Sequence, residues 1–399
     1  MSDHDTTPKS SGGKRVLILG GGVGGLSVAA ALRPQLTDQD TVTVVDRTGS
    51  HVQGLSLLWV LRGWRSAGDV VATPSAGSLP GVELVNGIVL EIDLDRHQVR
   101  TSTGTRPYDA LVIALGAELD LDAIPGLRHA LDQGTVGEFN TPAGATAAHD
   151  RLQALRSGRL VVVVASTPYR CPASPWEAAL LADDLLREAG VRDDVEIDVY
   201  TPEPQPMPIA GPTLGAAIVD LLGTRGIGAH FNRALTALHD THVSFNDQGL
   251  TDFTFALVVP PHRPPAAIRN VESFSGGWIP VDPRTLAVSE TTPGVWALGD
   301  SAMAPLPDGR PLPKAAVFAR GQAITVAAGV AAYLGRPSTH VDFDGVGHCY
   351  LEVGAHEAAK GAGNFYAPGG PDVRLEAANP ELHRAKQEEE SAWLEQWNQ

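Results

Sequence analysis

The sequence predicts an α/β chain with two Rossmann-like domains, each a parallel sheet with helices on both faces, followed by a small C-terminal region. Three observations predict this fold. Val16–Leu19 is a buried-type apolar strand that runs into a glycine cluster and an alanine-rich helix. Arg159–Ala165 is a second such strand, and it begins another strand–helix–strand unit. The length of 399 residues is too great for one ordinary domain.

The glycine cluster follows the first strand directly, in the stretch KRVLILGGGVGGLSVAAAL. Gly20, Gly22 and Gly25 fit G-x-G-x-x-G, with Gly24 inside the same turn. The first glycine permits a tight turn, the second lets the backbone approach a pyrophosphate, and the third lets helix pack on strand. The N-terminus of the following helix offers free N–H groups to phosphates. The pattern predicts a dinucleotide site and leaves NAD and FAD equally open.

An acidic residue follows the second strand, at the position where a dinucleotide site binds the ribose. The strand Thr41–Val45 ends in Asp46, whose carboxylate is placed to accept hydrogen bonds from a ribose diol. Arg47 follows directly and is the next candidate cofactor-binding residue. Two strand-like runs, Val82–Val89 and Gln98–Ser102, then predict a small inserted β-meander.

The domain limits follow from composition and chain order. Residues 1–13 are polar and predict a disordered leader. Residues 14–122 and 278–340 form the first domain, because from Trp278 the chain returns to it with a strand that ends at Gly299. Residues 123–277 form the second domain, and residues 341–399 the C-terminal region, which carries the second cysteine.

The second domain has the nucleotide-binding layout without the phosphate-binding turn. Its first strand runs into Ser166–Glu177, where prolines stand in place of glycines and no glycine lets backbone approach a pyrophosphate. The helix Ala178–Ala189 and the strand Val195–Tyr200 follow. Cys171 occupies the turn instead.

The chain has two cysteines, Cys171 and Cys349. Arg170 and the following helix N-terminus are both expected to lower the thiol pKa of Cys171. Glu177 is either a proton shuttle or an acid that complements the helix dipole. Sequence spacing alone leaves open whether the cysteines pair. His262 and His348 are weaker acid/base candidates that could equally be ordinary loop residues.

Composition narrows partners and compartment. A net charge of −16 disfavours nucleic acids and anionic membranes as partners. Two cysteines do not make a secreted disulfide framework, and we expect no apolar run long enough to span a bilayer. The expected location is the cytoplasm. At the C-terminus, Leu382, Trp393, Leu394 and Trp397 could contact the inner face of a membrane, but Glu388–Glu390 favour a tail that caps the protein.

Four stretches of the chain, from Lys14 to the C-terminus, resemble the sulfide:quinone oxidoreductases and the flavoprotein subunit of flavocytochrome c sulfide dehydrogenase. They are Thr167–Glu177, Gly299-Asp300, Leu312–Lys314 and Gly347–Tyr350. The resemblance implies an FAD cofactor. It assigns Asp46 to the adenosine ribose, Gly116 to a second FAD fingerprint, Asp300 to a ribityl hydroxyl and Lys314 to the flavin pyrimidine edge.

The same resemblance implies a reaction. Cys171 and Cys349 would form a redox pair that oxidises sulfide or a small thiol, and FAD would pass the electrons to an acceptor, expected to be a quinone. No cysteine lies in His51–Trp59, so FAD should be non-covalent, and the lack of a third cysteine places long polysulfide products in doubt.

Two other functions stay open from sequence. One is an NADH-dependent flavin reductase resembling type II NADH dehydrogenase or ferredoxin reductase, against which the missing second glycine turn argues. The other is a flavin-binding partner subunit whose cysteines only pack. A homodimer is also left open.

Overall fold

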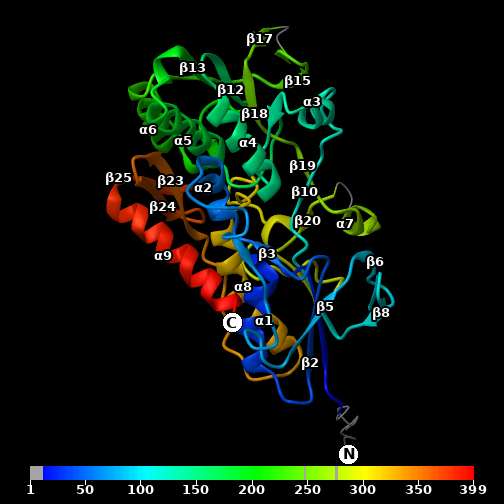
Figure 1. Cartoon of the computed structure of the whole chain (residues 1–399). Coiled ribbons are helices and arrows are strands. Elements are labelled where there is room, and N and C mark those ends of the chain that lie inside the picture. Colours follow the sequence, from blue (N-terminus) through cyan, green and yellow to red (C-terminus); the bar gives the residue numbers. More distant parts are fainter. Residues whose placement is uncertain (1–11, 247–248, 275–276) are drawn as a thin grey trace, which may run out of the picture.

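A computed structural model describes residues 12–246, 249–274 and 277–399. Most of the expected leader, residues 1–11, lies outside these ranges. The first domain holds a five-stranded parallel sheet in the order β21-β9-β1-β2-β5 (Figure 1). Its strands are β1 (Arg15–Leu19), β2 (Thr41–Asp46), β5 (Val82–Asn86), β9 (Ala110–Ile113) and β21 (Val295–Ala297).

The second domain repeats this plan with the order β11-β18-β12-β13-β14, again all parallel. Its strands are β11 (Val136–Gly137), β12 (Gly158–Val164), β13 (Val195–Tyr200), β14 (Ile227–His230) and β18 (Phe255–Val259). The two parallel sheets confirm the predicted α/β fold class. In both, the central strands are buried on both faces, which explains their unbroken apolar sequences.

Helices cover both sheets. They are α1 (Val23–Leu32), α2 (Leu57–Arg62), α3 (Leu127–Gln133), α4 (Pro142–Ala154), α5 (Ser174–Glu188), α6 (Pro212–Thr224), α7 (Ala266–Arg269), α8 (Ala316–Tyr333) and α9 (Pro380–Trp397). Helix α5 begins at Ser174, four residues earlier than predicted, so Glu177 lies in its first turn.

Helix α8 corrects the expectation that no run could span a bilayer, because it is long and apolar enough by length and composition. It packs against α1 and β23, and 56% of the helix is buried inside the protein, as in a core helix.

Small antiparallel sheets connect the larger parts. The predicted meander begins later than expected: Val82–Asn86 joins the parallel sheet as β5, and the meander is β6 (Val89–Asp93), β7 (Gln98–Thr101) and β8 (Gly104–Pro107). A second meander is β15 (Leu235–Leu238), β16 (His242–Phe245) and β17 (Leu250–Asp252). Two-stranded pairs are β3 (His51–Val52) with β4 (Val71–Ala72), β10 (Glu118–Leu119) with β19 (His262–Arg263), and β20 (Ile279–Pro280) with β22 (Ala302–Met303).

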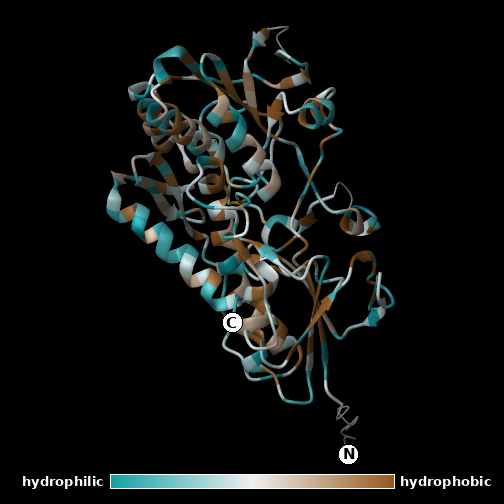
Figure 2. Cartoon of the chain, viewed as in Figure 1, coloured by the Kyte–Doolittle hydropathy of each residue, from teal (hydrophilic) through white to brown (hydrophobic). Residues whose placement is uncertain are grey.

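The C-terminal region is a three-stranded antiparallel sheet crossed by the last helix. The strands are β23 (Val346–Gly354), β24 (Glu357–Asn364) and β25 (Asp372–Asn379), and α9 runs from them along one side of the molecule (Figure 1). Figure 2 shows α9 to be largely hydrophilic, whereas the central strands of both parallel sheets are largely hydrophobic. The far end of α9 reaches the first domain, where Thr73 N donates to Asn398 Oδ1 at 2.7 Å.

Candidate active site

The glycine turn between β1 and α1 has the geometry of a phosphate cradle. Gly20 has φ +102°, and a Cβ there would lie 2.2 Å from the Ala114 carbonyl oxygen. A Cβ on Gly25 would lie 1.9 Å from the Gly20 carbonyl oxygen, so both positions require glycine. At Gly22 the space is open, and the nearest neighbour of such a Cβ is His51 Nδ1 at 3.7 Å. Gly24 packs against Leu298.

A polar atom beside this turn lacks a partner. His51 is half-buried, and its Nε2 is shielded from solvent and makes no hydrogen bond within the described ranges. A buried polar group normally has a partner, so an unpaired imidazole nitrogen beside an open glycine turn fits a polar ligand. The turn therefore fits the pyrophosphate of a dinucleotide.

Asp46, at the end of β2, holds the turn in place. Its Oδ2 accepts from Gly21 N at 2.8 Å, and its Oδ1 accepts from Thr48 N at 2.8 Å and Gly49 N at 3.1 Å. Burial opposes ionisation, but these hydrogen bonds outweigh it and lower the pKa of Asp46. Arg47 is exposed next to it.

The residues assigned to two further FAD fingerprints lie together. Ser301 Oγ donates to the Gly116 carbonyl at 3.2 Å, and Gly299 N donates to Gln322 Oε1 at 2.8 Å. Asp300 is half-buried. Lys314 Nζ donates to the Asp300 carbonyl oxygen at 2.6 Å, which ties the lysine to the strand end.

Lys314 is a buried cation beside an open space. Its Nζ lies 3.6 Å from the ring centroid of Trp278, and burial lowers the pKa of Lys314 to about 8. A cavity of about 240 Å³ is lined by Lys314, Gly299 and seven neighbouring residues. A lysine here can stabilise negative charge on a bound group.

Cys171 lies directly beside Lys314. The backbone N–H of Cys171 donates to the Lys314 carbonyl at 2.8 Å, and Cys171 has φ +54°, an uncommon backbone conformation for a residue other than glycine. Ser174 N donates to the Cys171 carbonyl at 2.8 Å at the start of α5. The lysine and the first cysteine are thus fixed to each other through the main chain.

The predicted low pKa of Cys171 is wrong. Burial and the nearby Glu177 carboxylate raise its pKa to about 12, although Lys386 lowers it. Arg170 does not supply the expected cation, since its Nη2 donates to the Asn140 carbonyl at 3.0 Å. In the reduced state Cys171 is therefore a neutral thiol that needs a base.

Cys349 comes from the middle of β23. Burial and then the neighbouring Cys171 raise the pKa of Cys349, and the helix α5 that follows Cys171 packs on β23. Both cysteines are half-buried and both are free thiols in this structure. The fold therefore places in one region the two cysteines whose pairing sequence spacing left open.

A buried charged cluster surrounds Glu177. Lys386 Nζ, from α9, lies 2.6 Å from Glu177 Oε1 and 3.5 Å from Glu352 Oε1. His383 Nδ1 is 2.9 Å from Glu352 Oε2, and Trp59 Nε1 donates to Glu352 Oε1 at 3.0 Å. The four ionisable side chains of this cluster are each at most 4% exposed.

The cluster tunes Glu177 for proton transfer. Burial raises the pKa of Glu177 to about 7, although Lys386 opposes the shift. A carboxyl that titrates near neutral pH beside a thiol can serve as a general base. The shuttle interpretation of Glu177 therefore gains a physical basis.

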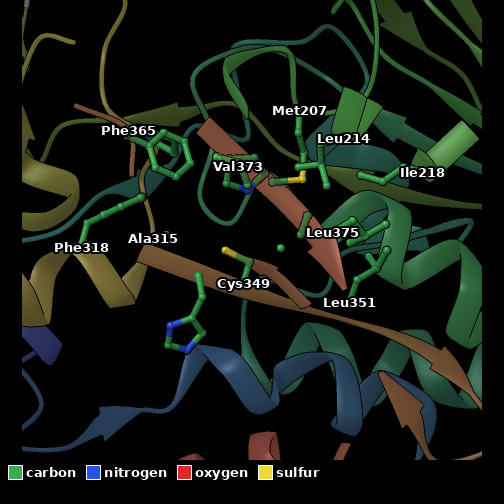
Figure 3. Close-up of a pocket in the computed structure, with 15 residues that line it drawn as sticks. Met207, Leu214, Ile218, Ala315, Phe318, Cys349, Leu351, Phe365, Val373 and Leu375 are labelled. Carbon is green, nitrogen blue, oxygen red and sulfur yellow. The ribbon is translucent and has the colours of Figure 1, made fainter. Parts of the chain in front are cut away.

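An apolar cavity lies beside Cys349 (Figure 3). The empty space there, including the part open to solvent, is about 520 Å³. The labelled side chains around Cys349 come from the second domain, from α8 and from the C-terminal sheet (Figure 3). The lining residues are Pro172, Ala173, Met207, Leu214, Ile218, Pro313, Ala315, Phe318, His348, Cys349, Leu351, Gly361, Phe365, Val373 and Leu375.

The turn in the second domain is closed to a dinucleotide. Tyr169, which is 3% exposed, donates its hydroxyl to Glu203 Oε2 at 2.9 Å, just beyond β13. An acid after the second strand would bind a ribose in a nucleotide-binding unit. Here Thr201 Oγ1 also donates to Glu203 Oε2, at 3.2 Å, so Tyr169 and Thr201 share one oxygen of this carboxylate.

The two histidines have different surroundings. His262 Nδ1 is 2.8 Å from the Pro260 carbonyl, and burial together with the charge on Arg170 lowers the pKa of His262 to about 3. It is therefore a neutral imidazole at physiological pH. His348 Nε2 is 3.0 Å from Glu389 Oε2, on the face of β23 that α9 covers. Of these three candidate acid/base residues, we therefore favour Glu177 as the base.

Sequence reasoning missed part of the site. Lys386, Glu352, His383 and Trp59 were not among the candidates. The signal was the spacing of Leu382, Lys386, Trp393 and Trp397 on one face of a helix in the C-terminal tail. Leu382, Trp393 and Trp397 are buried against the protein, as expected for a capping tail, whereas Leu394 is half-buried.

Residues 14–323 match the model of the family described as pyridine nucleotide-disulphide oxidoreductase. The chain belongs to this family. Its members are FAD-binding flavoproteins, which confirms the predicted cofactor, and the glycine turn, Asp46 and Lys314 are the residues that would hold it. The predicted resemblance to sulfide:quinone oxidoreductases is also confirmed.

Individual relatives agree with this assignment. The mitochondrial sulfide:quinone oxidoreductase of Mus musculus is 24% identical over 73% of this chain, and the match spans 66% of that protein. A type II NADH:quinone oxidoreductase of Staphylococcus saprophyticus is 24% identical over 86% of this chain and 88% of its own length. The solved sulfide:quinone oxidoreductase of Aquifex aeolicus has the same fold, with a TM-score of 0.81 at 21% identity over 96% of this chain and 91% of its own.

Proposed function

We propose that this protein is an FAD-dependent oxidoreductase that oxidises sulfide or a small thiol through Cys171 and Cys349 and passes the electrons to a quinone. The observation that carries the proposal is that Cys349 and the residues directly after Cys171 line one cavity, next to Lys314 and the buried Glu177. The sulfide:quinone oxidoreductases among its relatives support the substrate and the acceptor.

The contacts suggest a role for each cysteine. The backbone N–H of Cys171 is hydrogen-bonded to the carbonyl of Lys314, so we place Cys171 on the cofactor side. Cys349 instead lines the apolar cavity. In the oxidised pair, HS⁻ attacks Cys349 Sγ. The bond between the cysteines breaks, a bond to the incoming sulfur forms, and Cys171 leaves with the electron pair of the broken bond.

The cycle closes in two steps. A second thiol takes the outer sulfur from Cys349, which leaves both cysteines reduced. Re-forming their disulfide then releases two protons and two electrons, and FAD, when bound, is the two-electron acceptor. The net reaction combines sulfide, an acceptor thiol and oxidised cofactor into a persulfide and reduced cofactor.

Glu177 provides the base for these protons. Both thiols have pKa values raised well above neutral, so they lose protons only to a nearby acceptor. Glu177, whose pKa is about 7, accepts a proton at physiological pH, and Lys386 holds its carboxylate in place.

The NADH-dependent alternative is supported by the type II NADH:quinone oxidoreductase of Staphylococcus saprophyticus, whose match spans 86% of this chain and 88% of that protein. Against it, the second-domain turn carries prolines, and Tyr169 occupies the Glu203 carboxylate that a ribose would need. A nicotinamide dinucleotide would have to bind without a glycine turn and replace the hydrogen bond from Tyr169 to Glu203. We therefore favour the sulfur substrate.

Anaerobic titration of the flavin-loaded protein tests the proposal. Sulfide should bleach the flavin, added quinone should restore its absorbance, and NADH should do little. Cys171→Ser should retain FAD but lose sulfide-dependent bleaching. Full bleaching of that variant by sulfide would refute the cysteine mechanism, and rapid bleaching of the native protein by NADH would favour the alternative.

A further inference from the structure

We propose that the cavity beside Cys349 binds a neutral, apolar organic thiol, and that this thiol takes the sulfur from Cys349. The inference rests on the proposed function and names its second substrate. Charged thiols, which carry carboxylate, sulfonate or phosphate groups, would be excluded.

The first argument is the chemistry of the cavity wall. Of the lining residues, His348 alone has a side chain that is commonly charged near neutral pH. In a strand, neighbouring side chains point to opposite faces, so His348 faces α9 and Glu389 while Cys349 and Leu351 face the cavity. Among the described residues that line the cavity there is no Lys or Arg, and His348 is already paired with Glu389, so an anionic substrate would meet no free cation. Burying an unpaired charge is strongly unfavourable.

The second argument is where the open space lies. On the C-terminal sheet, Cys349 is paired with Gly361, which in turn is paired with Leu375. Because Gly361 has no side chain, space is left directly beside the thiol. A Cβ at Gly361 would lie 3.8 Å from Leu214 Cδ1, an ordinary contact, so a larger side chain there would fill the cavity without a backbone clash.

The third argument is which groups an occupant would touch. The cavity is bounded by Cys349 and by Pro172 and Ala173, the two residues after Cys171. Pro313, Ala315 and Phe318 line both this cavity and the one beside Lys314, so they lie between the two spaces. An occupant therefore meets the sulfur of Cys349 directly, as a sulfur acceptor must. The aliphatic and aromatic wall suits an alkyl or aryl body.

The transfer balances without a further reactant. The thiol sulfur of the bound RSH attacks the outer sulfur of the Cys349 persulfide. The bond between that sulfur and Cys349 Sγ breaks, a bond between the two substrate sulfurs forms, and the proton of RSH ends on Cys349. The products are RSSH and the Cys349 thiol, and no electrons are exchanged with the cofactor.

Covalent labelling tests the cavity independently of turnover. The flavin-loaded Cys171→Ser protein retains Cys349 as its one cysteine, and it is treated with benzyl methanethiosulfonate or with the anionic sulfonatoethyl methanethiosulfonate. Each labelling rate is divided by the rate of the same reagent with free cysteine. On this scale the benzyl reagent should label Cys349 about tenfold faster, or more, than the sulfonatoethyl reagent, which corresponds to a modest difference in binding free energy. Equal rates, or faster labelling by the anion, would overturn the proposal.

A matched pair of variants locates the effect. Gly361→Val in this background should slow benzyl labelling by about tenfold, while the exposed neighbour Ala362→Val should leave it unchanged. Gly361→Ala, whose added methyl meets only ordinary contacts, gives a milder test if the valine variant does not fold. Unchanged labelling in folded Gly361 variants would refute the cavity as the binding site.

Turnover separates this inference from the proposed function. With sulfide as donor, the native protein should form the persulfide of benzyl mercaptan faster than that of 2-mercaptoethanesulfonate, as measured by mass spectrometry. If sulfide fails to reduce the flavin at all, the proposed function fails, while the labelling ratio still decides the nature of the cavity. If Gly361→Val instead raises the KM for quinone and spares thiol persulfidation, the cavity is a quinone site and the inference is wrong.

Discussion

Lys386 Nζ lies 2.6 Å from Glu177 Oε1, inside the protein, and this pair joins the last helix to the helix that follows the first cysteine. Lys386 and Glu177 are 1% and 3% exposed at the side chain. Removing one partner of a buried pair leaves the other charge uncompensated. The proton affinity of Glu177 therefore depends on α9.

Lys386→Met should destabilise the protein by about 3–5 kcal/mol, because Glu177 and Glu352 would both lose their shared cation. Urea unfolding monitored by circular dichroism gives the free energy of unfolding. Arg384→Met, on the same helix but exposed, is the control and should change stability little. Equal stability of the two variants would argue against a structural role for the buried pair.

Glu177→Gln should remove a pH transition from flavin reduction. In the native protein the carboxylate is the active form of the base, so the rate should rise with pH as Glu177 ionises, around its pKa of about 7. Sulfide itself ionises in this range, so both proteins are compared by stopped flow at a fixed HS⁻ concentration. A transition that persists in the glutamine variant would mean that another group supplies the base.

Lys314→Met should make the bound flavin harder to reduce. The buried ammonium stabilises negative charge in the cavity beside Gly299, and losing a tenfold stabilisation lowers a two-electron potential by about 30 mV. Spectrophotometric titration against a reference dye measures the potential. Arg96→Met, on the exposed first meander, removes a charge of the same sign and should leave the potential unchanged.

Asp46→Ala should weaken FAD binding by about tenfold or more, because the half-buried Asp46 is ionised and a hydrogen bond to a charged acceptor is stronger than one to a neutral group. The same change frees the Gly21 and Thr48 N–H groups that shape the turn. Fluorescence titration of the stripped protein with FAD measures the affinity. Asp38→Ala, an exposed acid nearby, should bind FAD normally, and a similar loss in both variants would contradict the assignment.

Local patterns were enough to predict the fold and a dinucleotide site, and the family resemblance implied that the dinucleotide is FAD. The glycine turn, the acid after β2 and the prolines that replace the second glycine turn each act through their own backbone or the next few residues. For that reason their meaning is visible in a short stretch of sequence. The boundaries were less accurate: Val82–Asn86 pairs with β2, and a pairing between distant strands is not encoded within either strand.

The electrostatics of the site could not be predicted in the same way. Arg170 stands next to Cys171 in sequence, yet its side chain turns to Asn140, whereas Lys386 approaches Glu177 from the other end of the chain. The thiol pKa follows burial and these long-range neighbours, so the adjacent arginine predicted the wrong direction. The cluster around Glu352 was missed because its members come from α2, β23 and α9.

Helix α9 also makes the site a long-range property of the chain. Lys386 lies 209 residues from Glu177 in sequence, and its Nζ is paired with that carboxylate. A cut that detaches α9 would leave Glu177 and Glu352 buried without the cation that they share. Damage to the last helix would therefore reach the acid of α5, while the glycine turn would keep its own local contacts.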